Sequence, residues 1–282
     1  MKRFLLNALV FALPLIIISY IKPLHDLYTE SYKRGNVGDE IYHSIKKSKR
    51  KTKSKKVFIG DSTGQQFFPN KEENESLYSL ACNQAIGVTG HFLLLNNYFL
   101  AGNNADTVFV FFTPYCFKNN LDQIYTYHYF LKPFYTDEYK PYLSERVMDQ
   151  VKKIPFYFLC QEPHILTSEW APNFSSKDKI SASFLSDLSV EYVQKIKTLC
   201  AEHNAELIFI SPPMRDAQRS EIEAVNKEEF ENLNLQDEFK SYFNSMIFLN
   251  DTNFRDDFHL KRPEEFKMHY ANLMAVEQIV SF

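Results

Sequence analysis

Short runs of β-branched and aromatic residues alternate with helix-like segments along most of the chain. The clearest run is Thr107–Phe112, which reads TVFVFF. Continuous apolar runs of this kind are typical of strands buried on both faces of a parallel sheet. Apolar residues recur with a helical period in Ser189–His203, and another buried strand is expected at Leu207–Ile210. The alternation predicts an α/β fold with a central parallel sheet covered by helices on both faces.

The expected elements also place polar residues along one edge of that sheet. Further strands are predicted at Val57–Gly60, 77–82 and Met246–Leu249, and further helices at about His91–Leu100 and Pro263–Ile279. In parallel α/β sheets the binding site lies beyond the carboxyl ends of the strands. We therefore expect this edge to gather the residues that follow the predicted strands: Ser62, Gly87, Thr113, Ser211 and His259.

A candidate nucleophile follows the first predicted strand. The sequence GDS at 60–62 places a serine on a strand-to-helix turn, and far along the chain residues 256–260 read DDFHL. A serine hydroxyl is a poor nucleophile near neutral pH, so it needs a base and a third group that orients the base. Ser62, His259 and Asp256 supply these residue types. Taken singly, Ser62 is better explained as a helix N-cap, and His259 as an ordinary loop histidine.

Taken together, these blocks resemble those of the SGNH (GDSL-type) hydrolase superfamily over roughly residues 57–282. The sequence GDS at 60–62 matches the first block, and Asp256 with His259 matches the last. The sequence NQAIGVTG at 83–90 looks like the second block. The resemblance implies a three-layer α/β/α, flavodoxin-like SGNH fold and acyl transfer through a covalent ester on serine.

The resemblance also implies an oxyanion hole, made by the backbone N–H groups of Ser62 and Gly87. The third block departs from the family pattern, because the Gly-x-Asn-Asp of many members is replaced by FTPY at 112–115. The usual asparagine donor is therefore missing from its place. Asn119 and Asn120 lie nearby as substitutes, and the spacing does not choose between them.

Two further acidic residues flank the candidate catalytic groups. Asp61 precedes the serine, and the resemblance gives it a structural supporting role. Asp257 also neighbours His259, but the family spacing of three residues favours Asp256 as the carboxylate that holds the imidazole.

Composition limits the other functions. A chain of 282 residues with 45% hydrophobic content can bury one substantial core. A net charge of −3 gives no reason to expect nucleic acid. The four cysteines include no Cys-x-x-Cys pair, so zinc-type spacing is absent, and neither a metal nor a cofactor is expected. Two disulfides are possible, although Cys82 and Cys200 lie in apolar segments and favour buried thiols.

The first unit of the chain, residues 1–21, is predicted to be a single-pass membrane anchor. Residues 4–21 are predominantly apolar, follow Lys2 and Arg3, and lack a small-x-small cleavage site. Pro14 is tolerated in a spanning helix. Local positive charges are nearly balanced across the segment and do not orient it. The resemblance favours a catalytic domain outside the cytoplasm, periplasmic or extracellular.

Two other segments each have two possible roles. Residues 22–56 are expected to be a basic juxtamembrane linker, whose lysine-rich part at 46–56 is either simply solvated or contacts anionic lipid headgroups or an acidic polymer. An aromatic-rich insertion at about 114–175 interrupts the third unit, 57–282. Its rings either line a substrate wall or pack a small helical subdomain.

The function expected from the resemblance is O-acyl transfer or O-deacylation on a cell-envelope polysaccharide. Membrane-tethered relatives of this kind include teichoic-acid D-alanylation and polysaccharide O-acetylation proteins, which work beside membrane-bound O-acyltransferases. We therefore expect an envelope glycan or another acylated substrate, with a membrane-bound O-acyltransferase as a candidate partner. The alternatives are a catalytically degenerate glycan-binding or scaffolding protein and a lipid-cleaving esterase.

Overall fold

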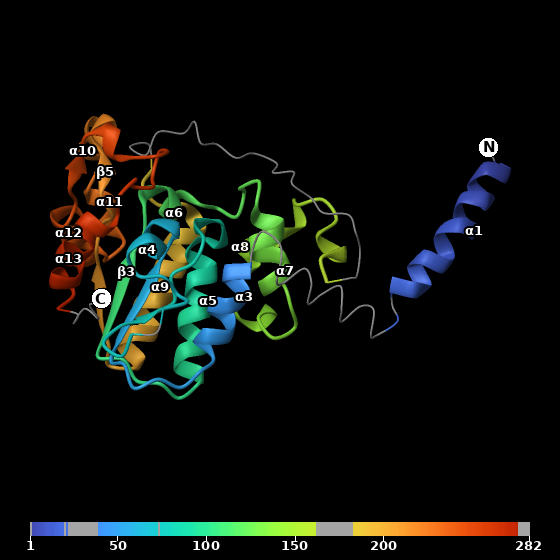
Figure 1. Ribbon diagram of the computed structural model, residues 1–282, viewed down its shortest axis with the longest axis horizontal. Helices are drawn as coiled ribbons and strands as arrows, with labels where there is room; N and C mark the ends of the chain where they lie inside the picture. The colour runs from blue at the N-terminus through green and yellow to red at the C-terminus, as the bar shows by residue number, and fades with distance from the viewer. Residues whose placement is uncertain (1, 20, 22–38, 73, 162–182, 276–282) are drawn as a thin grey trace.

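The computed structural model of the chain describes residues 2–19, 21, 39–72, 74–161 and 183–275 (Figure 1). Its central sheet has four parallel strands in the order β2-β1-β3-β4. The strands are β1 (Lys56–Gly60), β2 (Tyr78–Ser79), β3 (Thr107–Phe111) and β4 (Glu206–Phe209). The predicted α/β class with a central parallel sheet is confirmed.

Side chains of the central strands alternate between two buried clusters. Val57 and Ile59 of β1 pack with α5 (Gly87–Leu100) and α9 (Asp187–Glu202). Phe58, between them, packs with residues of α4 (Ser62–Phe67) and α13 (Glu264–Leu273) on the other face. Successive side chains of a strand point to opposite faces, so an uninterrupted apolar strand requires helices on both.

The strand expected at Met246–Leu249 does not join the central sheet. It is reduced to β6 (Phe248–Leu249), which pairs in parallel with β5 (Met214–Arg215) in a separate two-stranded sheet. Pro212 and Pro213 end β4, because proline has no N–H for the ladder. Between β5 and β6 lie α10 (Arg219–Glu223), α11 (Glu228–Asn232) and α12 (Gln236–Asn244).

The linker prediction for 22–56 is wrong for its second half. Asp39–Ser48 forms α3, and its Ile41 is fully buried in the cluster that contains α5. Lys47, inside the basic run, is buried, and its Nζ donates to the carbonyl oxygens of Asn70 at 2.7 Å and Glu72 at 3.0 Å. A buried lysine can be held in this way because its hydrogens find acceptors. Residues 22–38 lie outside the described part of the chain.

The N-terminal segment forms a helix, α1 (Lys2–Ser19), with exposed apolar side chains. The predicted anchor at 1–21 is not supported, since no helix among the described residues has both the length and the apolar character that crossing a membrane requires. Lys2 and Arg3 belong to the helix, and Asn7 and Pro14 interrupt its apolar run.

The described part of the aromatic insertion is a set of short helical segments. They are α6 (Pro114–Lys118), a π-helical turn (Tyr127–Leu131), α7 (Lys132–Phe134), a 3₁₀ turn (Lys140–Tyr142), α8 (Glu145–Lys152) and a second 3₁₀ turn (Tyr157–Leu159). The packing alternative is confirmed for five rings of its described part that are buried in the core: Phe117, Tyr127, Phe130, Phe134 and Tyr139. Residues 162–175 of the predicted insertion lie outside the described residues.

The four cysteines behave as small buried side chains. Cys82, Cys116, Cys160 and Cys200 are all free and buried. The disulfides that the count allowed do not form, and the expectation of buried thiols at Cys82 and Cys200 is confirmed.

Candidate active site

The turn after β1 presents Ser62 as the first residue of α4. The preceding residue, Asp61, is the N-cap, and its Oδ1 accepts hydrogen bonds from Thr63 N at 2.9 Å and Thr63 Oγ1 at 2.6 Å. The interpretation of Ser62 as the capping residue is therefore wrong. Gly60 permits the approach to β3, because a Cβ there would lie 2.8 Å from the Phe58 ring and 3.2 Å from the Phe111 carbonyl oxygen.

Asp61 also ties this turn to the end of β3. Its Oδ2 accepts from Thr113 N at 2.7 Å and Thr113 Oγ1 at 2.8 Å, and the carboxylate is fully buried. The four donors satisfy a buried charge that would otherwise be costly. One side chain thus fixes the serine turn to the loop that follows the neighbouring strand.

The histidine lies in a loop that closes on itself. Phe254 and Leu260 form an antiparallel bridge, and Arg255 N donates to the His259 carbonyl oxygen at 2.9 Å. Within the loop, Asp256 Oδ1 accepts from Phe258 N at 2.9 Å and His259 N at 2.8 Å. These bonds bring the carboxylate under the imidazole of the same loop.

The Asp256 carboxylate is held ionised by its neighbours. Partial burial acts to raise its pKa, but the N–H groups of Phe258 and His259 and the imidazole outweigh burial, and the pKa is lowered from its ordinary value. Both Asp256 oxygens lie 2.9 Å from His259 Nδ1. A negative acceptor there favours the tautomer that carries its proton on Nδ1.

The other ring nitrogen reaches the serine. His259 Nε2 lies 2.9 Å from Ser62 Oγ, across a sequence separation of 197 residues. With Nδ1–H donating to Asp256, Nε2 is an acceptor and can receive the serine proton. The structure thus brings together the three predicted residues, in the geometry that a serine nucleophile and its base require.

Asp257 has a different partner. Arg215 donates through Nη1 to Asp257 Oδ1 at 2.6 Å and through Nη2 to Asp251 Oδ2 at 2.9 Å. The hydrogen bond to Arg215 is also the main reason that the pKa of Asp251 is lowered. The spacing argument that chose Asp256 over Asp257 agrees with this geometry, and Arg215 braces the outer side of the histidine loop.

The donor groups of two predicted oxyanion-hole residues, Gly87 and Asn119, are already engaged in hydrogen bonds within the protein. Gly87 is buried at φ +61°, and its N–H donates to the Gln84 carbonyl oxygen. Asn119 lies against Gly87, but its Nδ2 donates to the same Gln84 oxygen at 2.7 Å and its Oδ1 accepts from Leu121 N at 2.8 Å. The structure therefore shows both groups holding the turn before α5. The N–H of Ser62 differs, because the first amides of a helix have no intrahelical acceptor.

Ser62 and His259 open into a wide pocket of about 460 Å³. Most of its lining is polar, and the residues are Glu40, Ser62, Gln65, Gln66, Asn83, Arg255, His259 and Pro263. Sequence reasoning missed Glu40, Gln65, Gln66 and Arg255, because none of them belongs to a recognised block. The position of Gln66, one helical turn after the serine, was the available signal.

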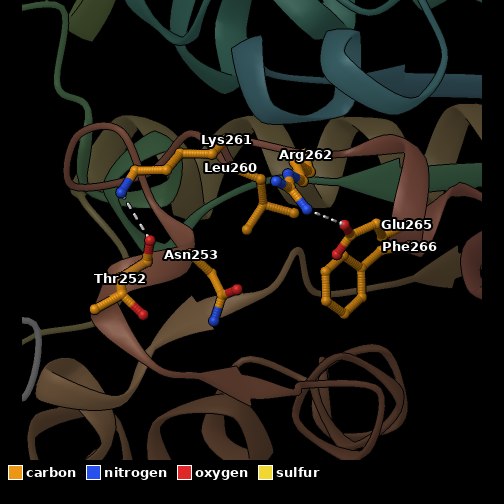
Figure 2. A pocket seen from close by; sticks show the side chains of 7 residues that line it. All are labelled: Thr252, Asn253, Leu260, Lys261, Arg262, Glu265 and Phe266. Atoms are coloured by element: carbon orange, nitrogen blue, oxygen red, sulfur yellow. Dashed lines mark hydrogen bonds and ion pairs between the residues drawn. The ribbon is translucent and has the colours of Figure 1, made fainter.

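A smaller pocket of about 200 Å³ is lined by seven residues between Thr252 and Phe266, Leu260 among them (Figure 2). Its charged groups are engaged locally: Lys261 Nζ donates to the Thr252 carbonyl oxygen at 2.8 Å, and Arg262 Nη1 lies 3.2 Å from Glu265 Oε1. None of the three catalytic candidates lines it. The described residues also contain no cluster of side chains suited to a metal ion.

The segment that replaces the third block contacts the histidine loop through an aromatic ring. Tyr115 packs edge-on against Phe258, with ring centroids 4.6 Å apart, and its hydroxyl accepts from Gln218 Nε2 at 3.1 Å. The Tyr115 ring therefore braces Phe258, the residue before His259.

Comparisons with known proteins returned no match, either to protein-family models or to curated proteins.

Proposed function

We propose that the chain is a serine-dependent O-acyl esterase or O-acyltransferase that acts on a cell-envelope polysaccharide. The observation that carries the proposal is the pair of 2.9 Å contacts that joins Ser62 Oγ to His259 Nε2 and His259 Nδ1 to Asp256. The block order, which resembles the SGNH superfamily, supports the same reaction class, as does the α/β sheet.

The reaction proceeds in two balanced steps. Ser62 Oγ attacks the acyl carbonyl carbon while its proton passes to His259 Nε2, and the imidazolium then protonates the departing alcohol, which leaves an ester on Ser62. In the second step, His259 takes a proton from water or from a sugar hydroxyl, whose oxygen attacks the ester carbonyl carbon. The bond between the acyl group and Ser62 Oγ then breaks, and the imidazolium returns its proton to Ser62 Oγ, which releases the free acid or the acylated sugar. Asp256 stabilises the imidazolium, and the N–H of Ser62 stabilises the oxyanion.

The pocket favours a hydroxylated substrate over a long acyl chain. Its wall supplies amides, a carboxylate and a guanidinium, which hydrogen-bond to sugar hydroxyls, and it offers little apolar surface for a lipid tail. The finer elements of the proposal rest on the resemblance: a three-layer SGNH fold, an extracytoplasmic site and a membrane-bound O-acyltransferase as partner.

One observation favours a second candidate, a catalytically inactive glycan-binding or scaffolding protein. The Gly87 N–H and the Asn119 amide, which would complete an oxyanion hole, both donate to the Gln84 carbonyl oxygen. Loss of one oxyanion donor costs about 2.7–4 kcal/mol of transition-state stabilisation. A protein that keeps the triad of Ser62, His259 and Asp256 without these donors would bind its glycan and turn it over slowly or not at all.

The two candidates are separated by labelling the full chain with a fluorophosphonate, which transfers its phosphonyl group to an activated serine oxygen and releases fluoride. The enzyme predicts labelling that disappears in Ser62→Ala and in His259→Ala. Ser220→Ala removes an exposed serine of α10 and is the matched control, which should label like wild type. A folded wild-type chain that resists the reagent would overturn the enzyme in favour of the scaffold.

A further inference from the structure

The side chain of Gln66 joins α4 to the backbone of the histidine loop. Its Nε2 donates to the Leu260 carbonyl oxygen at 3.2 Å, and its Oε1 accepts from Leu260 N at 3.1 Å. The amide therefore binds both polar groups of a single residue, the one that follows His259. Gln66 is half-buried and lines the pocket beside Ser62.

The placement of Gln66 follows from helix geometry. Residues four apart lie on the same face of a helix, so Gln66 and Ser62 project from the same face of α4 toward the same loop. One of them contacts the imidazole of His259, and the other contacts the backbone of the next residue. Leu260 is itself anchored, because its side chain is buried with Phe67 and Phe254.

The hydrogen bonds within the loop set its internal shape but not its distance from the serine. Asp256 and His259 are joined within the loop, so they move together. Arg215 holds the outer side, through Asp251 and Asp257. A rigid loop of this kind must still be held at a fixed position relative to α4. The two hydrogen bonds of Gln66 connect α4 to the loop at Leu260 and hold it in that position.

We propose that Gln66 is a positioning residue that sets the His259 imidazole against Ser62 Oγ. This role rests on the proposed serine chemistry. A nucleophile and its base work only when they are held in near-attack geometry, and a displacement of about 1 Å can cost roughly 100-fold in rate. Gln66 acts on the chemical step and leaves substrate affinity unchanged.

The test compares Gln66→Met with Gln66→Glu in the full chain. Methionine keeps the length of the side chain and loses both hydrogen bonds, whereas glutamate keeps the acceptor for Leu260 N. The matched control is Gln194→Met, which removes a glutamine that donates to the Leu233 carbonyl oxygen from α9. The assays are p-nitrophenyl acetate hydrolysis for kcat and KM, and thermal melting.

We expect kcat to fall about 10- to 100-fold in Gln66→Met, with KM within twofold of wild type. Gln66→Glu should retain more kcat than Gln66→Met, and Gln194→Met should retain wild-type kcat. The proposal is overturned if Gln66→Met keeps kcat within twofold. It is also overturned if KM carries the change, which would make Gln66 a substrate contact, or if Gln194→Met loses equal activity at an equal drop in melting temperature.

A second measurement decides the role of Gln66 even if the wild-type chain proves inactive. Amide hydrogen exchange is followed at residues 254–260 and, for comparison, along α13. We expect Gln66→Met to speed exchange of the loop amides by at least about tenfold and to leave α13 unchanged, because Leu260 N loses its acceptor. Unchanged loop exchange would overturn the positioning role, whereas inactivity of wild type with faster loop exchange in the variant would overturn only the proposed function.

Discussion

The buried imidazole of His91 should make the protein sensitive to acid. His91 lies on α5 and is fully buried, and neither ring nitrogen has a hydrogen-bond partner within the described residues. Its ring packs against Phe112, with centroids 4.6 Å apart. Burial lowers the pKa of His91 from 6.5 to about 3, since a charged ring would lose its hydration without gaining a partner.

The sign and size of the effect follow from proton linkage. Between pH 6.5 and about 3 the unfolded chain binds a proton at His91 that the folded chain does not bind. The free energy of unfolding is therefore fully retained above pH 6.5 and falls as the pH is lowered through this window. At about 1.4 kcal/mol per pH unit, lowering the pH from 7 to 5 should cost about 2 kcal/mol through this group.

The assay is urea unfolding at several pH values between 5 and 8, on wild type and on His91→Leu. Leucine has a similar volume and does not titrate, so the variant should lose about 2 kcal/mol less than wild type between pH 7 and pH 5. At pH 7 it should be as stable as wild type or more so, because the unpaired nitrogens are gone. His269→Leu, which removes an exposed imidazole, is the control and should follow wild type. Equal pH dependence in wild type and His91→Leu would refute the reasoning.

Five further substitutions test the site and its support. Asp61→Ala should lower the free energy of unfolding by about 3 kcal/mol or more in urea titrations, because it leaves the Thr63 and Thr113 donors without their acceptor; equal stability would contradict the capping role. Asp256→Asn should reduce kcat of ester hydrolysis by about 10⁴-fold, whereas Asp257→Asn should reduce it less than tenfold, and the reverse order would move the triad carboxylate to Asp257. Gly87→Ala should cost about 1 kcal/mol in urea unfolding, because its φ of +61° disfavours a Cβ. Lys47→Met should lower the melting temperature by several degrees, since the carbonyls of Asn70 and Glu72 lose a buried donor, and an unchanged melting temperature would argue against that anchor.

The sequence was most informative where chemistry and topology agree. Thr107–Phe112 could be assigned to a buried strand because its run of β-branched and aromatic residues is continuous. Ser62, Asp256 and His259 could be grouped because the order of their sequence blocks along an α/β chain resembles that of a known superfamily. The pairing of Met246–Leu249 could not be found in this way, since an apolar run does not say which strand it will join. The pairing of this segment depends on the end of β4 before Pro212 and on the presence of β5, with which β6 pairs.

The missed features share a different cause. The lysines around α3 suggested a solvated linker, and nothing in the sequence showed that Lys47 would find two carbonyl oxygens. Gln66 was missed because its spacing of four residues from Ser62 places it on the same helix face but does not show that its amide bonds to the backbone of Leu260. The oxyanion assignment of Gly87 came from a resemblance and could not reveal that its N–H bonds to Gln84.

Helix α3, which precedes the first strand of the sheet, belongs to the candidate active site. Ser44 Oγ donates to the carbonyl oxygen of Ala81, just before Asn83 of the pocket, and Glu40 is part of the pocket wall. A shortened chain that starts at β1 would keep Ser62, Asp256 and His259 and still lose Glu40 from the lining of the pocket. A chain that starts at Asp39 would keep it. Attempts to transplant this serine centre into another scaffold must therefore carry a helix that precedes the first strand of the sheet.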